Sequence, residues 1–233
     1  MLFAVPTGAA GDANLDGTRD ATGDEFVELF NPHDRPISLR GYRLTDKALG
    51  KGNSLTFTFP DCTLKPGEVA VVFNGYKATA IPGPVGDSGH AEGPNPRFRN
   101  ALVFSMKVQS GRQGFSNTGD AVLIYSPTGT VVQCIRWGKN DKLPDALLVE
   151  DAPVTSKSSV QRDGPRGQLA VHPPEAGLSF SPGAFGPPPP GTTTRSPATT
   201  APMPTSPSAT TPAPASPNKS SPPKHAPKTT PPR

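Results

Sequence analysis

Residues 25–30 read E-F-V-E-L-F, and the next two residues, N-P, end this run. Successive side chains of a β-strand point to opposite faces of the sheet. The two phenylalanines therefore share one face with a glutamate, while Val27 and Leu29 share the other face. Because both faces carry apolar side chains, the run predicts a strand that is covered on two sides.

Short apolar runs continue along the first 186 residues. Residues 55–59, L-T-F-T-F, alternate with a period of two and end at Pro60. Residues 65–68, K-P-G-E, have Pro and Gly at the two central positions of a type II turn, which leads into a buried strand at 69–73. A type I turn, S-P-T-G, joins two β-rich segments in a hairpin over 121–137. Weaker runs predict further strands at 2–5, 37–44, 159–162 and 169–172.

This pattern predicts an all-β fold, a sandwich or a barrel, with eight or nine strands and no long helix. The connection over 74–114 is long for a loop, so we expect a short helix or an extra strand near 101–108. We expect the connection over 138–158 to wrap one edge of the sheets. Residues 1–186 then form one domain, because this length suffices for one sizeable core.

Two dense segments carry a family resemblance. They are 11–31, G-D-A-N-L-D-G-T-R-D-A-T-G-D-E-F-V-E-L-F-N, and 114–125, G-F-S-N-T-G-D-A-V-L-I-Y. Together they resemble the prokaryotic form of the lamin tail domain, which implies an immunoglobulin-like β-sandwich. Further motifs agree with that family in its order, and they lie at 37–44, 64–73, 159–162 and 180–183.

The sequence departs from the family pattern at two places. Family members often open with an apolar-Asn-Glu-apolar strand, whereas this chain has F-A-V at 3–5, and its insertion at 76–112 is longer than a plain sandwich needs. The resemblance implies an accessory module of exported or surface proteins, sometimes attached to hydrolases. No catalytic residues come with the family, so function has to be argued from a site.

Residues 187–233 differ in composition from the rest of the chain. They hold 16 of the 32 prolines and five cations but no acid, so the net charge of +4 belongs to this tail. Such a segment cannot bury a core, and we expect a disordered, Pro/Thr/Ser-rich stalk. Four of the cations, Lys219, Lys224, Lys228 and Arg233, allow weak attraction to nucleic acid or to an anionic polymer.

The start of the chain, M-L-F-A-V-P, has only five apolar residues and lacks a basic leader, so it is not a signal peptide. Either the protein is made without a secretion signal or this start is internal to a longer chain. We expect the second, because residues 2–5 resemble a strand already under way. The sequence has no run of about 20 apolar residues, so we predict no membrane span.

An acidic loop is the strongest candidate for a binding site. Residues 12–20 read D-A-N-L-D-G-T-R-D, with oxygen ligands at alternate positions and Gly at the sixth, as in calcium loops. The twelfth position, which should hold a bidentate acid, is Gly23, although Asp24 and Glu25 follow it. The alternative is a loop whose side chains accept hydrogen bonds from their own backbone. If calcium binds, it is structural, with ligands Asp12, Asn14, Asp16, Asp20 and the Thr18 carbonyl.

Support for catalysis is weak. The histidines are scattered, and the sequence contains no G-x-S-x-G, H-E-x-x-H or phosphate-binding loop. His33 is predicted to be a turn residue. Cys62 and Cys134 have no zinc-binding spacing, and they could form one disulfide or remain buried thiols.

Two side chains in the predicted strands have alternative roles. Glu28 could be a ligand or an acid, but we favour an edge charge or an acceptor for a backbone or Arg donor, because buried acids are usually paired. Trp137 beside Arg136 could contact a sugar or a partner. A Trp in the core of the sandwich is the interpretation we favour.

The leading hypothesis is a non-catalytic, secreted or cell-surface module that binds a protein or a surface polysaccharide through its loops or a sheet edge. A second hypothesis is association with nucleic acid or an anionic polymer through the basic tail. A third is an accessory fragment of a secreted hydrolase.

Overall fold

A computed structural model describes residues 1–3, 5–46, 55–79, 93–139, 143, 149–155, 158–164, 166–172 and 179–185. All of them fall within one compact unit, Met1–Thr193. The tail predicted at 187–233 lies outside the described residues. Among the described residues, no helix has the length and apolar character needed to cross a membrane.

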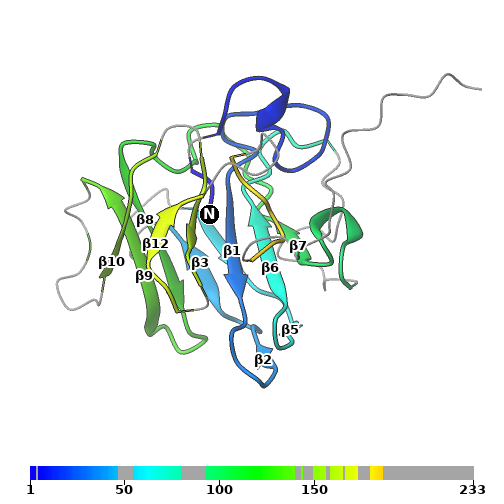
Figure 1. The fold of residues 1–233 in the computed structure, drawn as a ribbon, viewed down its shortest axis with the longest axis vertical. Coiled ribbons are helices and arrows are strands. Elements are labelled where there is room, and N and C mark those ends of the chain that lie inside the picture. The colour runs from blue at the N-terminus through cyan, green and yellow to red at the C-terminus, as the bar shows by residue number, and fades with distance from the viewer. Residues whose placement is uncertain are drawn as a thin grey trace, which may run out of the picture. The chain divides into compact units, whose positions relative to one another are not determined.

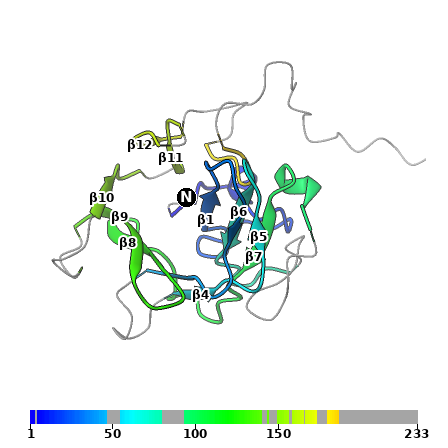
Figure 2. The ribbon, with the colours of Figure 1, turned by 90° about the horizontal axis from the view of Figure 1, so that it is seen from below.

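Two sheets face each other in an immunoglobulin-like β-sandwich, as predicted (Figure 1). The three-stranded sheet has the order β1 (Phe26–Phe30), β6 (Val69–Phe73), β7 (Leu102–Ser105). The five-stranded sheet has the order β10 (Val149–Ala152), β9 (Val131–Gly138), β8 (Gly119–Tyr125), β3 (Arg43–Thr45), β4 (Thr56–Thr58). Viewed from below, the two sheets lie on opposite sides of the fold (Figure 2).

Smaller elements complete the sandwich. Two short pairs are β2 (Ile37–Ser38) with β5 (Thr63–Leu64), and β11 (Val160–Arg162) with β12 (Leu169–Val171). Figure 2 shows the β11–β12 hairpin between the edge strands β1 and β10. Two 3-10 turns are η1 (Ala9–Gly11) and η3 (Pro96–Phe98).

The main core fills the space between the two sheets. Val27 and Val72 enter it from the three-stranded sheet, and Leu44, Phe57 and Trp137 enter it from the five-stranded sheet. A buried side chain of this size stabilises the fold by roughly 1.5–3 kcal/mol. Trp137 is 1% exposed, which confirms its predicted place in the core.

A second core lies on the outer face of the three-stranded sheet. Phe26 and Phe73 point to this face, where Leu2, Phe98 and Phe180 cover them. Phe26 lies edge-on to the rings of Phe73 and Phe180, at 5.6 and 6.4 Å between ring centroids. The prediction that the E-F-V-E-L-F strand is covered on both faces is confirmed.

Several predictions about elements need correction. The strand expected at 2–5 is a single bridge between Leu2 and Phe26, and Ala4 lies outside the described residues. The described chain has twelve strands rather than eight or nine, because two- and three-residue pairs form beside turns. The connection over 138–158 contains an edge strand, β10. Its sequence, V-E-D-A, did not predict a strand because two of its four residues are acidic.

The turn and loop predictions hold. Gly67 has a φ of 75°, and Glu68 N donates to Lys65 O at 3.0 Å, as a type II turn requires. The element expected near 101–108 is strand β7, which pairs parallel to β6.

Candidate functional site

The acidic loop lies between η1 and β1, and its side chains accept hydrogen bonds from the backbone of the loop. Asp12 accepts from Asp16 N with Oδ1 at 3.1 Å and from Gly17 N with Oδ2 at 3.0 Å. Asn14 Oδ1 also accepts from Asp16 N, at 3.0 Å. Asp16 Oδ1 accepts from Thr18 N at 2.8 Å. Backbone capping, the alternative role for these side chains, is therefore present.

The far end of the loop is organised in the same way. Asp20 Oδ1 accepts from the N–H groups of Thr22 and Gly23, both at 2.9 Å. Asp24 is fully buried and accepts from Asn14 N at 2.9 Å and from Asp20 N at 2.7 Å. Burial raises the pKa of Asp24 to about 6, although these hydrogen bonds favour the charged form.

The predicted calcium ligands thus lie in one loop, and the metal itself remains a prediction. Among the described residues, no group of three or more His, Cys, Asp or Glu side chains is arranged to hold a metal ion. Calcium loops also use amide and carbonyl oxygens, which Asn14 and Thr18 supply here.

The acidic loop is tied to its neighbours across the same end of the sandwich. Asp16 Oδ2 accepts from Thr79 N at 3.1 Å, and Leu15 O accepts from Arg97 Nη2 at 2.9 Å. Gly75 N donates to Gly23 O at 3.0 Å. These contacts connect three chain segments that lie far apart in the sequence.

A shallow, solvent-open hollow lies beside the acidic loop, lined by residues 75–78 and 107–109. Tyr76 is half-buried, and Lys77 Nζ lies 5.1 Å from the centre of its ring. Lys77 and Lys107 both have a positive φ, of 56° and 49°. Non-glycine residues held in this strained region cluster at functional sites. The hollow is therefore lined by one tyrosine and two lysines.

Two glutamates of the first predicted strand are anchored by backbone donors. Glu25 is 3% exposed, and its Oε2 accepts from Phe115 N at 3.0 Å and from Asn74 Nδ2 at 3.3 Å. Burial raises the pKa of Glu25 to about 9. Glu28 Oε1 accepts from Gly183 N at 2.6 Å, which confirms the favoured role of a backbone acceptor. Burial raises the pKa of Glu28 to about 7.

A family model described as Lamin Tail Domain matches residues 8–139, from η1 to the end of β9. The chain belongs to the lamin tail domain family. No curated protein matches the sequence.

The matched part of this lamin tail domain contains the acidic loop and the hollow. Met1 to Phe3, β10 to β12 and the segment over 179–185 lie outside the matched residues. They nevertheless contribute to both cores, through Phe3, Val160 and Phe180.

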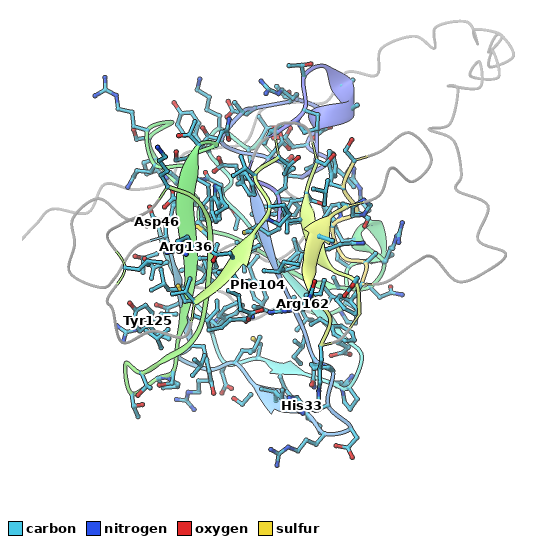
Figure 3. All side chains as sticks on the ribbon, turned by 60° about the vertical axis from the view of Figure 1, so that its left-hand side comes forward. His33, Asp46, Phe104, Tyr125, Arg136 and Arg162 are labelled. Atoms are coloured by element: carbon cyan, nitrogen blue, oxygen red, sulfur yellow. The ribbon has the colours of Figure 1, made fainter. Side chains whose placement is uncertain are left out.

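Two histidines and two cysteines of the lamin tail domain, considered as possible functional side chains, occupy structural positions. His33 N donates to Asn31 Oδ1 at 3.0 Å within a turn, as predicted, and Figure 3 shows His33 at the end of the fold that holds β2. His172 is buried, with Nε2 at 2.8 Å from Ser181 Oγ. Cys62 and Cys134 are buried free thiols, so they do not form a disulfide with each other.

Sequence reasoning found the acidic loop but missed the hollow and the burial of Glu25. The loop is contiguous in the sequence, so its spacing can be read directly. Tyr76 and Lys107 come together only because residues 75–79 and 106–108 both follow strands of one sheet; the backbone bond from Val108 N to Asn74 O, at 3.3 Å, shows this. No pattern in the sequence marks that contact.

Proposed function

We propose that this lamin tail domain is a non-catalytic binding module of the cell exterior, and that its partner is a surface polysaccharide bearing acidic groups. The observation that carries the proposal is the hollow around Tyr76. A sugar can stack on the face of the Tyr76 ring opposite Lys77 Nζ, while the ammonium groups of Lys77 and Lys107 can pair with carboxylate or sulfate groups. Exposed Gln109 adds a hydrogen-bonding amide at the rim.

The rest of the domain fits a scaffold that presents this hollow. Binding groups on loops are effective when a rigid framework positions them. Here the acidic loop is bonded to Thr79, and strand β6 leads directly into Gly75. The Pro/Thr/Ser-rich composition of 187–233 suits a stalk that holds the module away from a surface.

Calorimetric titration with heparin, with alginate and with neutral dextran tests the proposal. We expect the acidic polymers to bind and dextran to bind much more weakly. Tyr76→Ala and the double change Lys77→Ala/Lys107→Ala should each weaken binding about tenfold, which corresponds to about 1.4 kcal/mol. Lys65→Ala, at the exposed β5–β6 turn, is the matched control and should bind like wild type.

The tail hypothesis predicts a different result in the same titration. Deleting residues 187–233 should leave binding at the hollow in place. If binding is lost on the deletion and is unchanged by the substitutions at Tyr76, Lys77 and Lys107, the basic tail is the binding site instead.

We also propose that calcium, if it binds the acidic loop, stiffens the wall of the hollow. The oxygens of Asp12, Asn14, Asp16 and Asp20 support this, since all four lie in one loop that reaches Thr79. A ligand at 100 times its Kd stabilises the folded state by about 2.7 kcal/mol, so calcium should raise the melting temperature relative to EGTA.

Asp20→Asn separates calcium binding from backbone capping. Asp20 accepts the N–H groups of Thr22 and Gly23 on the same oxygen, Oδ1, so the amide oxygen of Asn can keep both bonds. The change removes one negative charge, so the melting temperature in EGTA should change little while the calcium shift falls. An identical melting temperature of wild type with and without calcium would remove the metal from the proposal.

A further inference from the structure

Two buried asparagines occupy equivalent places at opposite ends of the sandwich. Asn31 directly follows β1 and Asn74 directly follows β6, and both are 1% exposed. Oδ1 of Asn31 accepts from His33 N at 3.0 Å. In the same way, Oδ1 of Asn74 accepts from Tyr76 N at 3.2 Å. Because β1 and β6 are antiparallel, Asn31 lies at the end of the fold that holds His33 (Figure 3), while Asn74 leads into the hollow.

Asn74 bonds to both walls of the hollow. Through Oδ1 it holds the backbone of Tyr76 in one wall. Its backbone oxygen accepts from Val108 N in the other wall, at 3.3 Å. Its Nδ2 donates to Gln113 O at 2.9 Å, in the segment that continues from this second wall. One buried residue therefore connects the segment that carries Tyr76 to the segment that carries Lys107.

Glu25 in turn holds Asn74. The backbone oxygen of Glu25 accepts from Asn74 N at 2.8 Å. Its carboxyl Oε2 accepts from Asn74 Nδ2 at 3.3 Å and from Phe115 N at 3.0 Å. A Cβ atom at Gly114 would lie 3.0 Å from the same oxygen, so the chain packs closely against the carboxyl group. Glu25 thus ties Asn74 to the segment that leads into β8.

The turn at Asn31 shows that this kind of cap can be made without a buried acid. There, Nδ2 donates to two backbone carbonyls, Arg35 O and Leu64 O, both at 2.9 Å. Removing a carboxyl group from water costs free energy, and Glu25 is 3% exposed. This cost falls at the end of the sandwich that carries the hollow. Departures of this kind concentrate at functional sites, where a fixed geometry is kept at the expense of stability.

We propose that Asn74 and Glu25 are positioning residues of the binding site at the hollow, an inference that rests on the function proposed above. Both are buried, so they act through the walls rather than by touching a sugar. They fix the spacing between the backbones of Tyr76 and Lys107 before a ligand arrives. Binding to walls that are already ordered costs less conformational entropy, so the affinity for an acidic polysaccharide depends on these two side chains.

Calorimetric titration of the 233-residue chain with alginate tests this role through the two equivalent asparagines. Asn74→Ser keeps an oxygen that can accept from Tyr76 N, but it removes the two bonds that the amide nitrogen donates. It should weaken binding at least fivefold. Asn31→Ser is the matched control, because it makes the same change in the same kind of turn at the other end of the fold. Its affinity should stay within twofold of wild type.

Hydrogen exchange at the Val108 amide gives a readout that needs no ligand. This N–H donates to the backbone oxygen of residue 74, which both Asn74→Ser and Glu25→Ala leave in the chain. Faster exchange therefore means that the two walls have separated. We expect at least tenfold faster exchange in either variant and no change in Asn31→Ser. Glu25→Gln, whose amide oxygen can accept the same two bonds, should restore most of the protection and of the binding that Glu25→Ala loses.

Equal affinity of wild type and Asn74→Ser would overturn the proposal. Equal losses in Asn74→Ser and Asn31→Ser would also overturn it, because general destabilisation would then explain both. If Asn74→Ser does not fold, the comparison of Glu25→Ala with Glu25→Gln decides, and wild-type exchange at Val108 in Glu25→Ala contradicts the positioning role. Failure of the function proposed above gives a different result: wild type does not bind alginate, or Tyr76→Ala binds it as tightly. The exchange rates at Val108 then still show whether Asn74 and Glu25 hold the two walls together.

Discussion

Three acids lie close together in the sequence: Asp24 and Glu25, which are buried, immediately before β1, and Glu28, which is half-buried, within it. Burial raises the pKa of Asp24 to about 6, of Glu28 to about 7 and of Glu25 to about 9. An ordinary carboxyl group titrates near pH 4, so between about pH 4 and 9 the folded state binds more protons than the unfolded state. The contribution of these three groups to stability is therefore greatest below the unfolded pKa, falls as pH rises from there to each folded pKa by up to about 1.4 kcal/mol per pH unit and group, and is constant above it.

Glu25→Gln should flatten the upper part of this profile. Above about pH 7, Asp24 and Glu28 are largely ionised in the folded state, and Glu25 is the one of the three that still holds its proton. Urea unfolding of wild type from about pH 7 to 9 should show a falling free energy of unfolding, and the variant should lose most of that slope. Glu68→Gln, in the β5–β6 turn, should keep it; equal slopes in all three proteins would contradict the assignment.

Gly183 shows a different constraint at the scale of one residue. Its φ is 86°, and a Cβ atom there would overlap the backbone oxygen of Phe98. Gly183→Ala should cost about 1–3 kcal/mol, because strain and displacement of the bond to Glu28 add together. Gly164→Ala, where a Cβ meets no atom within 4 Å, should change the free energy of unfolding by less than about 0.5 kcal/mol in the same chemical denaturation.

At the scale of elements, Arg162 connects the β11–β12 hairpin to the edge of the five-stranded sheet. Its Nη2 donates to Glu150 Oε1 on β10 at 2.8 Å, and its Nη1 donates to Gly167 O at 3.0 Å. The hydrogen bond from Arg162 lowers the pKa of Glu150. Glu150 is 41% exposed, so solvent screening limits the strength of the pair.

Arg162→Met should lower the free energy of unfolding by about 1 kcal/mol, because it removes one charged pair and one bond within the hairpin. The effect should shrink in high salt, which screens the ionic part. Arg40→Met is the control: its pair with Asp61 spans 3.6 Å between side chains that are 75% and 57% exposed, so we expect less than about 0.5 kcal/mol. Equal losses in both variants would contradict the connecting role of Arg162.

At the scale of the whole molecule, one aromatic contact links the first residues to the five-stranded sheet. Phe3 stacks on Trp137 with ring centroids 4.4 Å apart, and Trp137 Nε1 donates to Ser116 O at 2.7 Å. Because the chain has one Trp, its fluorescence reports on the main core alone.

Unfolding followed by Trp fluorescence and by far-ultraviolet circular dichroism should give coincident transitions, since both sheets share this core. Phe3→Ala should lower both midpoints together, at a cost of about 3–5 kcal/mol. Val132→Ala, at a side chain that is 54% exposed, serves as the control. Separate transitions for the two probes would show that the sheets unfold independently.

The fold was predictable where the sequence pattern is local. Strands β1, β4, β6, β8 and β9 have strong apolar runs with clear turn residues, and the structure has all five. The apolar faces of β1 predicted a cover on both sides, but the residues that form the second core were not predictable, because Leu2, Phe98 and Phe180 come from three distant segments. Strand β10 was missed because an edge strand needs few apolar side chains.

In the candidate site, too, the local features were predictable from the sequence and the long-range contacts were not. The acidic loop was visible because its oxygen donors alternate within nine residues. Burial raises the pKa of Glu25, although hydrogen bonds from Phe115 N and Asn74 Nδ2 favour its charged form, and this environment depends on tertiary packing rather than on spacing. Long-range contacts of this kind produce no periodic pattern in the sequence.

The two free cysteines have a practical consequence. Burial raises the pKa of Cys62 to about 11 and also raises that of Cys134, so both sulfurs are protonated and shielded in the folded state. Alkylating reagents attack the thiolate, so modification has to wait for the chain to open. The rate at which a maleimide modifies the two thiols should therefore report how often the folded chain opens spontaneously. Mass spectrometry can follow this modification without any engineered label.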